Sequence, residues 1–375
     1  MKRPTSVVGL LAATIVVLAV CACAPAVHTG ANSSPSHTSH PHPTPTPTQA
    51  AAPSVRVPVK CSSLFADATV APLIDVPVKY HLDETTNPVD ITSVVARQYG
   101  TLVCLWGGAG RTDGGYDQNL TVEVSPDAAS GFDANIATIE SQSDPVVKNS
   151  AGDQSEYTCG VAGEYQCSAN MLVGTFWVSA YLQDLGNSTI PQATAKSRMQ
   201  QVLVTLAGEL KNTTALPAWN PPGAALPSFC SEAGSTAEVN TALGGTDFGI
   251  TGEDQAPADA DSYSQQPGVY TQCTWSSAAS TGKFTFLEIG MVKGGAWVLP
   301  QLTGETDDEN YLLGAYTPIT IPGADSAVSS CSQAAQQCQV MLSIGSLLVS
   351  IDLDDASPTL VTAALTKIVA DISAS

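Results

Sequence analysis

The sequence predicts an α+β protein with two tandem homologous domains, each an antiparallel sheet with helices packed on one face and two disulfides. Three observations support this fold class: two cysteine sets with nearly equal spacing, segments whose apolar residues alternate as in half-buried strands, and an amphipathic segment closing each set. The cysteines are separated by 43, 55 and 8 residues in the first set and by 43, 58 and 7 in the second. The sets are Cys61, Cys104, Cys159 and Cys167, and Cys230, Cys273, Cys331 and Cys338.

Residues near the cysteines also repeat. Segment 61–74, CSSLFADATVAPLI, aligns with segment 230–243, CSEAGSTAEVNTAL, and GTFWVSAYLQD from Gly174 aligns without a gap with GSLLVSIDLDD from Gly345. A chain that repeats itself over this length is a tandem duplication. The Pro-rich stretch LPAWNPPGAALP separates the copies, so we assign the domains to residues 55–215 and 216–375.

Several segments read as strands. Cys104 and Trp106, like Cys273 and Trp275, are two residues apart, so in a strand each pair points to one side, and we expect both tryptophans in the core beside a disulfide. In QNLTVEV, residues 118–124, apolar and polar side chains alternate. Its counterpart KFTFLEI changes phase between Phe286 and Leu287, which indicates a β-bulge. Residues 164–181 read as two strands folded at Gly174, with the counterpart folded at Gly345.

Helices are expected at both ends of each copy. Asp67 and Thr236 are predicted N-caps of short opening helices, and Ser357 with Pro358 is expected to start the second closing helix. The predicted buried stripes of the closing helices are Met199, Val202, Leu203, Leu206 and Leu210, and Leu360, Val361, Ala364, Leu365, Ile368 and Ile372. An immunoglobulin sandwich fits poorly, because its tryptophan lies well after the first cysteine and it has no terminal helices.

Four cysteines per copy allow three pairings, which sequence alone does not distinguish. We predict sequential pairing, Cys61 with Cys104 and Cys159 with Cys167, repeated as Cys230 with Cys273 and Cys331 with Cys338.

The N-terminus has the order of a secretion signal. Lys2 and Arg3 precede an apolar run over residues 7–20, which is shorter than the about 20 residues of a membrane-spanning helix. We assign residues 1–22 to a bacterial lipoprotein signal peptide and expect the lipid, including palmitate, on Cys23, with Cys21 as the alternative. Lipid on Cys23 leaves eight cysteines to pair, whereas lipid on Cys21 leaves Cys23 as a free thiol. Free secretion after cleavage elsewhere is the remaining alternative.

Residues 23–54 are rich in Pro, Thr and Ser and contain no acidic residue, so a disordered tether is expected. It would hold the folded part at the outer face of the cytoplasmic membrane, in the cell envelope. The formal net charge of −20 excludes nucleic acid as a partner, because such binding needs clustered Lys and Arg.

Catalytic residues are scarce. His81 is the only histidine after the tether, and we place it on the surface in a polar loop, YHLDETTNP. The segments STGK (280–283) and WGGAGRTDGGY (106–116) lie in expected turns and lack the helix start that a catalytic Ser-x-x-Lys motif or a phosphate loop requires. The acidic segments 305–309 and 352–355 are candidate Ca²⁺ ligands on loops, with solvated surface as the preferred reading. We expect no catalytic residue, metal or cofactor.

The early Cys61-Ser62, the later Cys104-x-Trp106, the Pro/Thr spacer and the closing helix resemble actinobacterial cell-envelope lipoproteins of uncharacterised function. They are distantly similar to the extracellular sensor domains of mycobacterial receptor kinases. The resemblance implies a disulfide-bearing α+β fold and a binding or sensing role without catalysis. This chain differs in carrying two copies and in lacking a kinase domain.

The sequence therefore predicts a lipid-anchored, non-catalytic, extracytoplasmic binding or sensing protein, with a small apolar ligand or an envelope protein as partner. The first alternative is a structural or accessory protein that supports a neighbouring envelope complex. The second is a hydrolase of envelope polymers, which would need two facing carboxylates in one cleft.

Overall fold

A computed structural model describes most of the chain after the predicted tether. The described residues are 52–83, 91–108, 118–132, 147–160, 165–184, 191–223, 225–226, 230–233, 235–243, 248–254, 268–277, 286–304, 315–332, 337–354, 365–366, 368–370 and 372. They all belong to one compact unit, Thr48–Ser375. Both candidate lipid-bearing cysteines lie outside them. Within the described residues, no helix is long and apolar enough to cross a bilayer.

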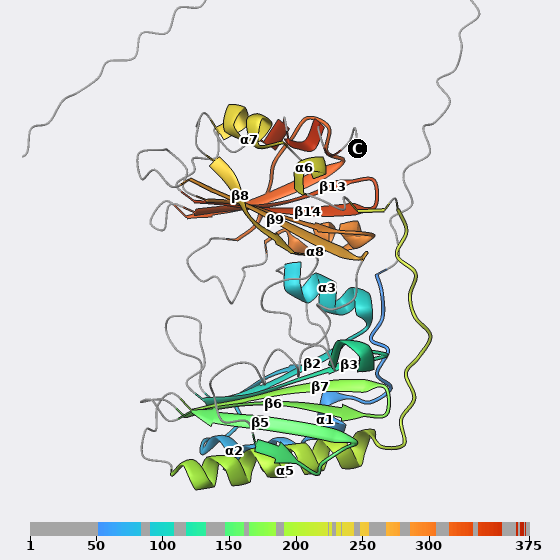
Figure 1. Cartoon of the computed structure of the whole chain (residues 1–375), viewed down its shortest axis with the longest axis vertical. Helices are drawn as coiled ribbons and strands as arrows, with labels where there is room; N and C mark the ends of the chain where they lie inside the picture. The colour runs from blue at the N-terminus through green and yellow to red at the C-terminus, as the bar shows by residue number, and fades with distance from the viewer. Residues whose placement is uncertain are drawn as a thin grey trace, which may run out of the picture. The chain divides into compact units, whose positions relative to one another are not determined.

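Two antiparallel seven-stranded sheets form the framework, one in each copy (Figure 1). Sheet 1 has the order β1-β2-β3-β7-β6-β5-β4, and sheet 2 the order β11-β12-β13-β14-β10-β9-β8. Read from opposite ends these orders are identical, which confirms the predicted tandem α+β fold. The strands of sheet 1 are β1 (Tyr80–Asp83), β2 (Leu102–Gly107), β3 (Gln118–Ser125), β4 (Val147–Asn149), β5 (Gln154–Gly160), β6 (Tyr165–Val173) and β7 (Phe176–Asp184). Those of sheet 2 are β8 (Phe248–Asp254), β9 (Tyr270–Ser277), β10 (Phe286–Val292), β11 (Thr317–Pro318), β12 (Ser326–Ser332), β13 (Gln337–Ile344) and β14 (Leu347–Asp354).

The opening and closing helices of each copy cover one face of its sheet, which we call its inner face. In the first copy these are α1 (Cys61–Leu64), α2 (Asp67–Ile74) and α5 (Gln192–Leu210), and in the second α6 (Cys230–Ala233) and α7 (Thr236–Leu243). The predicted stripe of α5 is buried from Met199 to Leu210, which confirms the first closing helix. In the second closing segment residues 365–366, 368–370 and 372 are helical, with Leu365, Ile368 and Ile372 buried. Leu360, Val361, Ala364, Ser357 and Pro358 lie outside the described residues.

The cysteines and tryptophans lie where the spacing predicted. Cys104 and Trp106 are both buried on the inner face of β2, and Cys273 and Trp275 are buried on the inner face of β9. The Phe65 ring meets the Trp106 indole edge to face at a centroid distance of 5.6 Å. In β3, burial alternates as expected through Leu120, Val122 and Val124.

The predicted sequential pairing of the cysteines is confirmed. Cys61–Cys104 and Cys230–Cys273 each close a span of 43 residues and join the first short helix to the Cys-x-Trp strand. Cys159–Cys167 and Cys331–Cys338 link residues directly opposite each other on neighbouring strands. The next hairpins along the chain, β6–β7 and β13–β14, turn at the predicted glycines, Gly174 and Gly345, whose φ angles are 61° and 59°.

The predicted helix caps were wrong by one residue. Asp67 and Thr236 are the first helical residues, and the caps are Ala66 and Ser235. Ser235 Oγ accepts from the Glu238 N–H at 3.3 Å, while the Ser235 N–H donates to Glu238 Oε2 at 2.9 Å, a capping box. Ala66 has no side-chain acceptor, so only the second copy has this cap.

The predicted bulge in β10 was also wrong. Pairing with β9 and β14 continues without a shift from Phe286 and Leu287 onward. The apolar phase changes because Leu287 is buried on the inner face, whereas Phe286 is an apolar residue that is half-buried on the opposite face. The irregularity of this sheet lies in its edge strand β8, between Ile250 and Gly252.

Candidate binding face

The two sheets differ on the face opposite the inner face, which we call the outer face. In sheet 1, the cross-strand register aligns Glu156, Asn170, Ser179 and Glu123 in one row across β5, β6, β7 and β3. Tyr181 occupies the next row, opposite Thr121. Side chains directly opposite on neighbouring strands are contact neighbours. We call Glu123, Glu156, Asn170, Ser179 and Tyr181 the polar face.

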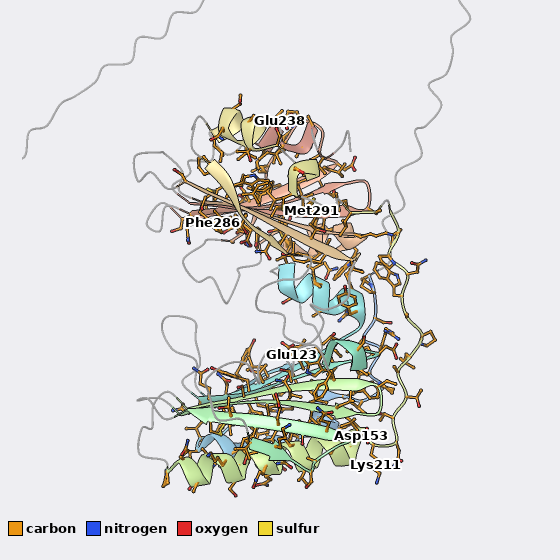
Figure 2. The ribbon with its side chains drawn as sticks, in the orientation of Figure 1. Glu123, Asp153, Lys211, Glu238, Phe286 and Met291 are labelled. Atoms are coloured by element: carbon orange, nitrogen blue, oxygen red, sulfur yellow. A yellow bond between two sulfur atoms is a disulfide. The ribbon has the colours of Figure 1, made fainter. Side chains whose placement is uncertain are left out.

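Burial is uneven along the polar face. Glu156 and Asn170 are only 4% and 8% exposed, whereas Glu123, Ser179 and Tyr181 are half-buried. Figure 2 shows Glu123 on the side of sheet 1 away from α5. Charged residues are rarely buried to this degree unless they are paired, so the carboxylate of Glu156 marks a polar environment on this face.

Hydrogen bonds fix the side chains around the row. The Trp177 indole Nε1 donates to Asn170 Oδ1 at 2.9 Å, and the Phe132 ring meets Trp177 edge to face at 5.8 Å. The hydroxyl of Thr101, just before β2, is 3.1 Å from that of Ser125 in β3. These bonds hold the polar groups of this end of the face in fixed positions.

Part of the corresponding face of sheet 2 is apolar, while Ser350 and Asp352 there match Ser179 and Tyr181 of sheet 1. The positions that match Glu156, Asn170 and Trp177 are taken by Val328, Met341 and Leu348. All three are buried in a cluster with η1 (Gly295–Val298), α8 (Leu299–Leu302) and α3 (Ile91–Tyr99). Helix α3 belongs to the first copy, so this helix joins the core of the second.

Close contacts seat α3 on sheet 2. A Cβ at Gly290 would come within 2.8 Å of Ile91 Cδ1, so a larger residue here would have to displace the end of the Ile91 side chain. Gln98 Nε2 donates to the carbonyl of Lys293 at 3.2 Å. At the end of α3, burial raises the pKa of the Tyr99 phenol well above its usual value, which keeps the ring neutral in the physiological range.

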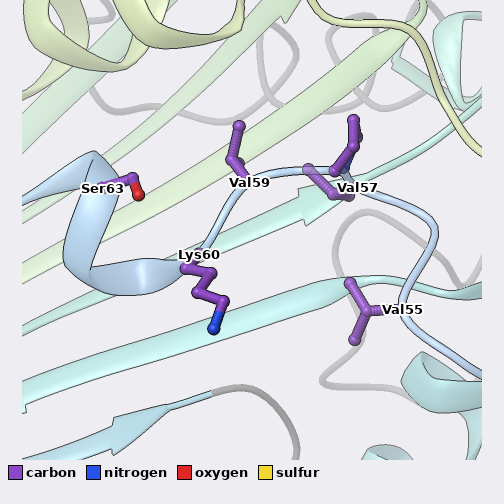
Figure 3. Close-up of a pocket in the computed structure, with 6 residues that line it drawn as sticks. Val55, Val57, Val59, Lys60 and Ser63 are labelled. Carbon is purple, nitrogen blue, oxygen red and sulfur yellow. The ribbon is translucent and has the colours of Figure 1, made fainter.

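A hollow of about 470 Å³ lies beside the segment that leads into α1 (Figure 3). Its lining is mostly aliphatic, and exposed Pro58, Lys60 and Ser63 make its rim accessible to solvent. Small-molecule sites are usually concave and bury most of the ligand. This hollow lacks convergent polar groups, so it is a weaker candidate than the polar face. It is lined by Val55, Val57, Pro58, Val59, Lys60 and Ser63.

His81 lies on the surface as predicted, but in strand β1 and not in a polar loop. Its imidazole Nδ1 is 3.9 Å from Asp67 Oδ1, and its side chain is 53% exposed. Because this segment is polar, it was predicted as a loop, but it forms a short edge strand that pairs with β2. No group of carboxylate, histidine and cysteine side chains in the described part of the chain is arranged to hold a metal ion.

Of the two acidic segments proposed as candidate Ca²⁺ ligands, the structure describes part of the second and none of the first. Asp352 and Asp354 are in strand β14, not on a loop, and Asp352 faces Glu288 across the strand pair. Residues 305–309, STGK and most of WGGAGRTDGGY lie outside the described residues.

Sequence reasoning missed both α3 and the polar face. The signal for α3 was the apolar spacing of Ile91, Val94, Val95 and Tyr99. The signal for the polar face was that Asn170 in the first copy aligns with Met341 in the second, a polar residue against an apolar one. No family model, curated protein or solved structure matches this chain.

Proposed function

We propose that this chain is a lipid-anchored, non-catalytic binding protein of the cell envelope, and that it binds its ligand on the polar face of sheet 1. The observation that carries the proposal is the contrast between matching positions of two sheets with identical topology. Sheet 2 has Gly290, Val328 and Met341 at three of these positions and covers them with η1, α8 and α3, whereas sheet 1 presents two carboxylates and an amide there.

The chemistry of the polar face favours a ligand rich in hydrogen-bond donors. Glu123 and Glu156 accept hydrogen bonds when ionised, and Ser179 and Tyr181 both donate and accept them. A ligand with amino or hydroxyl groups can form hydrogen bonds with these side chains, whereas an apolar ligand can form none. The small apolar ligand expected from the sequence is therefore replaced by a polar one in this proposal.

The location follows from the cysteines and the N-terminus. Four disulfides are typical of an oxidising, extracytoplasmic compartment. An acyl chain on Cys23 would tie the protein to the outer face of the cytoplasmic membrane. Replacing Cys23 with Ser should release the protein from membranes in fractionation, and continued retention would favour Cys21.

The binding function is tested by native mass spectrometry of the full chain purified gently from envelopes. Glu123→Gln should reduce the fraction that carries a co-purifying ligand about tenfold, because a charge-assisted hydrogen bond is lost. Glu288→Gln is the matched control, since Glu288 is a half-buried carboxylate on the outer face of sheet 2. Equal loss in both variants, or no bound ligand in the unchanged chain, would contradict the proposal.

A structural or accessory role is the alternative, favoured by the covered face of sheet 2, which leaves α3 joining the copies into one support. Crosslinking in intact envelopes discriminates the two functions. A structural role predicts one partner protein whose capture does not change in the Glu123→Gln variant.

A further inference from the structure

Residues 53–57, which we call the strap, connect the end of the predicted tether to the folded part. The strap forms backbone hydrogen bonds on both sides: the Arg56 N–H donates to the Gly100 carbonyl at 2.8 Å, and the Leu216 N–H donates to the Arg56 carbonyl at 2.8 Å. Arg97 on α3 donates through Nε to the Pro53 carbonyl at 2.8 Å. The strap therefore joins the end of α3 to the linker between the copies.

The Arg56 side chain reinforces this junction from within. Its Nε donates to the Leu216 carbonyl at 2.9 Å, its Nη1 donates to the Tyr99 carbonyl, and its Nη2 forms an ion pair with Asp127. Arg56 is only 8% exposed. Loss of its partners would leave the buried guanidinium charge uncompensated, which is strongly destabilising. We therefore expect these contacts to form and break together.

The backbone around Arg56 is shaped to admit it. Gly100 has a φ of +73°, and a Cβ there would come within 2.3 Å of Arg56 Cγ. Asp127, the ion-pair partner, also has a positive φ, 56°, which is uncommon for a residue other than glycine. The matching position in the second copy is Ala225, so the junction occurs only where the chain enters the first copy.

The strap is the direct neighbour of the helix that crosses between the copies. Arg56 binds the last residues of α3, while Val94, Val95 and Tyr99 of the same helix are buried in the outer cluster of sheet 2. The first turn of α3 contacts Gly290, and its last turn contacts the strap. The first turn of α3 is thus held by the second copy, and its last turn by the strap together with the second copy, through Gln98 and the Lys293 carbonyl.

From this geometry we propose that the strap is a lock: it holds α3 on sheet 2, and pulling the strap out frees the helix and exposes the part of the apolar outer face of sheet 2 that α3 covers. A tether under tension, or cleaved within the strap, would act directly on this lock. The device is independent of any ligand on the polar face, so it stands if the proposed binding function fails.

Hydrogen exchange of the full chain tests the lock, with Arg56→Ala as the variant. Amide exchange in α3 should rise about tenfold, while exchange in β3 and β7 stays within about twofold of the unchanged chain, since only the junction opens. Arg198→Ala is the matched control. Arg198 also binds one carboxylate and one carbonyl, Asp75 Oδ1 at 2.7 Å and the Leu73 carbonyl at 3.1 Å, but it joins α5 to α2 within the first copy.

Asp127→Asn is the second variant, because it removes only the charge of the partner and keeps the size of the side chain. It should raise exchange in α3 by a smaller factor than Arg56→Ala and leave the rest of the first copy unchanged. Gly290→Ala, which disturbs α3 from the other end, should raise exchange over the whole of α3, and its effect should multiply that of Arg56→Ala if both act on the same docking equilibrium, because the free-energy effects of distant sites add.

Two results would overturn the lock. One is unchanged exchange in α3 in both strap variants. The other is a rise in Arg198→Ala equal to that in Arg56→Ala, which would make the effect a general loosening of the first copy.

Discussion

The outer faces of sheets 1 and 2 have diverged while their inner faces have stayed alike. Both inner faces carry a Cys-x-Trp strand, two disulfides and buried aliphatic residues under helices. At matching outer positions, Thr101 and Ser125 of sheet 1 correspond to Tyr270 and Val292 of sheet 2. The first pair shares a hydrogen bond between hydroxyls, and the second pair packs against α3.

This difference shows which face determines the fold. A strand places alternate side chains on opposite faces, so the inner set can specify register while the outer set changes. Helix α3 packs in the outer cluster of sheet 2, and Val103 of sheet 1 packs against the same cluster. Where sheet 2 has Gly290 and Met341, sheet 1 has Glu123 and Asn170, which make its outer face polar.

Loss of the long-range disulfides should have the largest effect on the comparison. Cys61→Ser with Cys104→Ser should cost about 4 kcal/mol of unfolding free energy, because the closed loop is long, and Cys159→Ser with Cys167→Ser about 2.5 kcal/mol. Urea unfolding followed by tryptophan fluorescence measures both. The equivalent pairs of the second copy should give the same order, and a reversed order would show that the copies are not stabilised alike.

Making the outer face of sheet 2 resemble that of sheet 1 should come next. Met341→Asn buries an amide in an apolar cluster where the methionine is 0% exposed, and should cost about 3 kcal/mol. The measurement is thermal or urea unfolding of the purified chain. A cost under about 1 kcal/mol would mean that α3 does not depend on an apolar face.

The reverse exchange in sheet 1 should cost less. Asn170→Met removes the acceptor of the Trp177 indole N–H, and a buried donor without a partner costs about 2 kcal/mol, offset in part by the added apolar contact. Near-ultraviolet circular dichroism reports the Trp177 environment, and urea unfolding reports the free energy. A stabilised Asn170→Met variant would show that this asparagine is retained for binding and not for folding.

The caps of the opening helices give the smallest and most symmetrical test. Ser235→Ala should destabilise the second copy by about 1 kcal/mol, because it removes the capping box. Ala66→Ser at the matching position should stabilise the first copy by up to about 1 kcal/mol. Comparing the two urea midpoints checks whether the copies respond with opposite sign.

Much of the fold could be predicted because its determinants are local or repeated. The spacing of Cys104 and Trp106 is enough to place both on one face of a strand, and Gly174 and Gly345 mark turns that need a positive φ. Sequential pairing of the cysteines followed the order of the chain. The predicted β10 bulge was wrong because the pattern counted Phe286 as an inner-face residue, whereas this apolar side chain is half-buried on the outer face.

The candidate site was harder to predict, because it depends on which residues become neighbours across strands. Glu123, Ser179, Asn170 and Glu156 are spread over four strands and have no shared motif. Likewise, nothing near Ile91 in the sequence shows that α3 packs on the other copy. The close approach of Ile91 to Gly290 can be recognised only once the position of α3 is known.

The pairing of Arg56 with Leu216 has a practical consequence for dissecting the molecule. A fragment cut at the predicted boundary of 215 and 216 would lose the carbonyl that accepts from Arg56 Nε and the amide that donates to its carbonyl. The same cut would leave Val94, Val95 and Tyr99 in water on the first fragment and the apolar surface they covered on the second. Neither fragment would then keep the surface that it has in the intact protein, and each would expose apolar side chains that promote self-association.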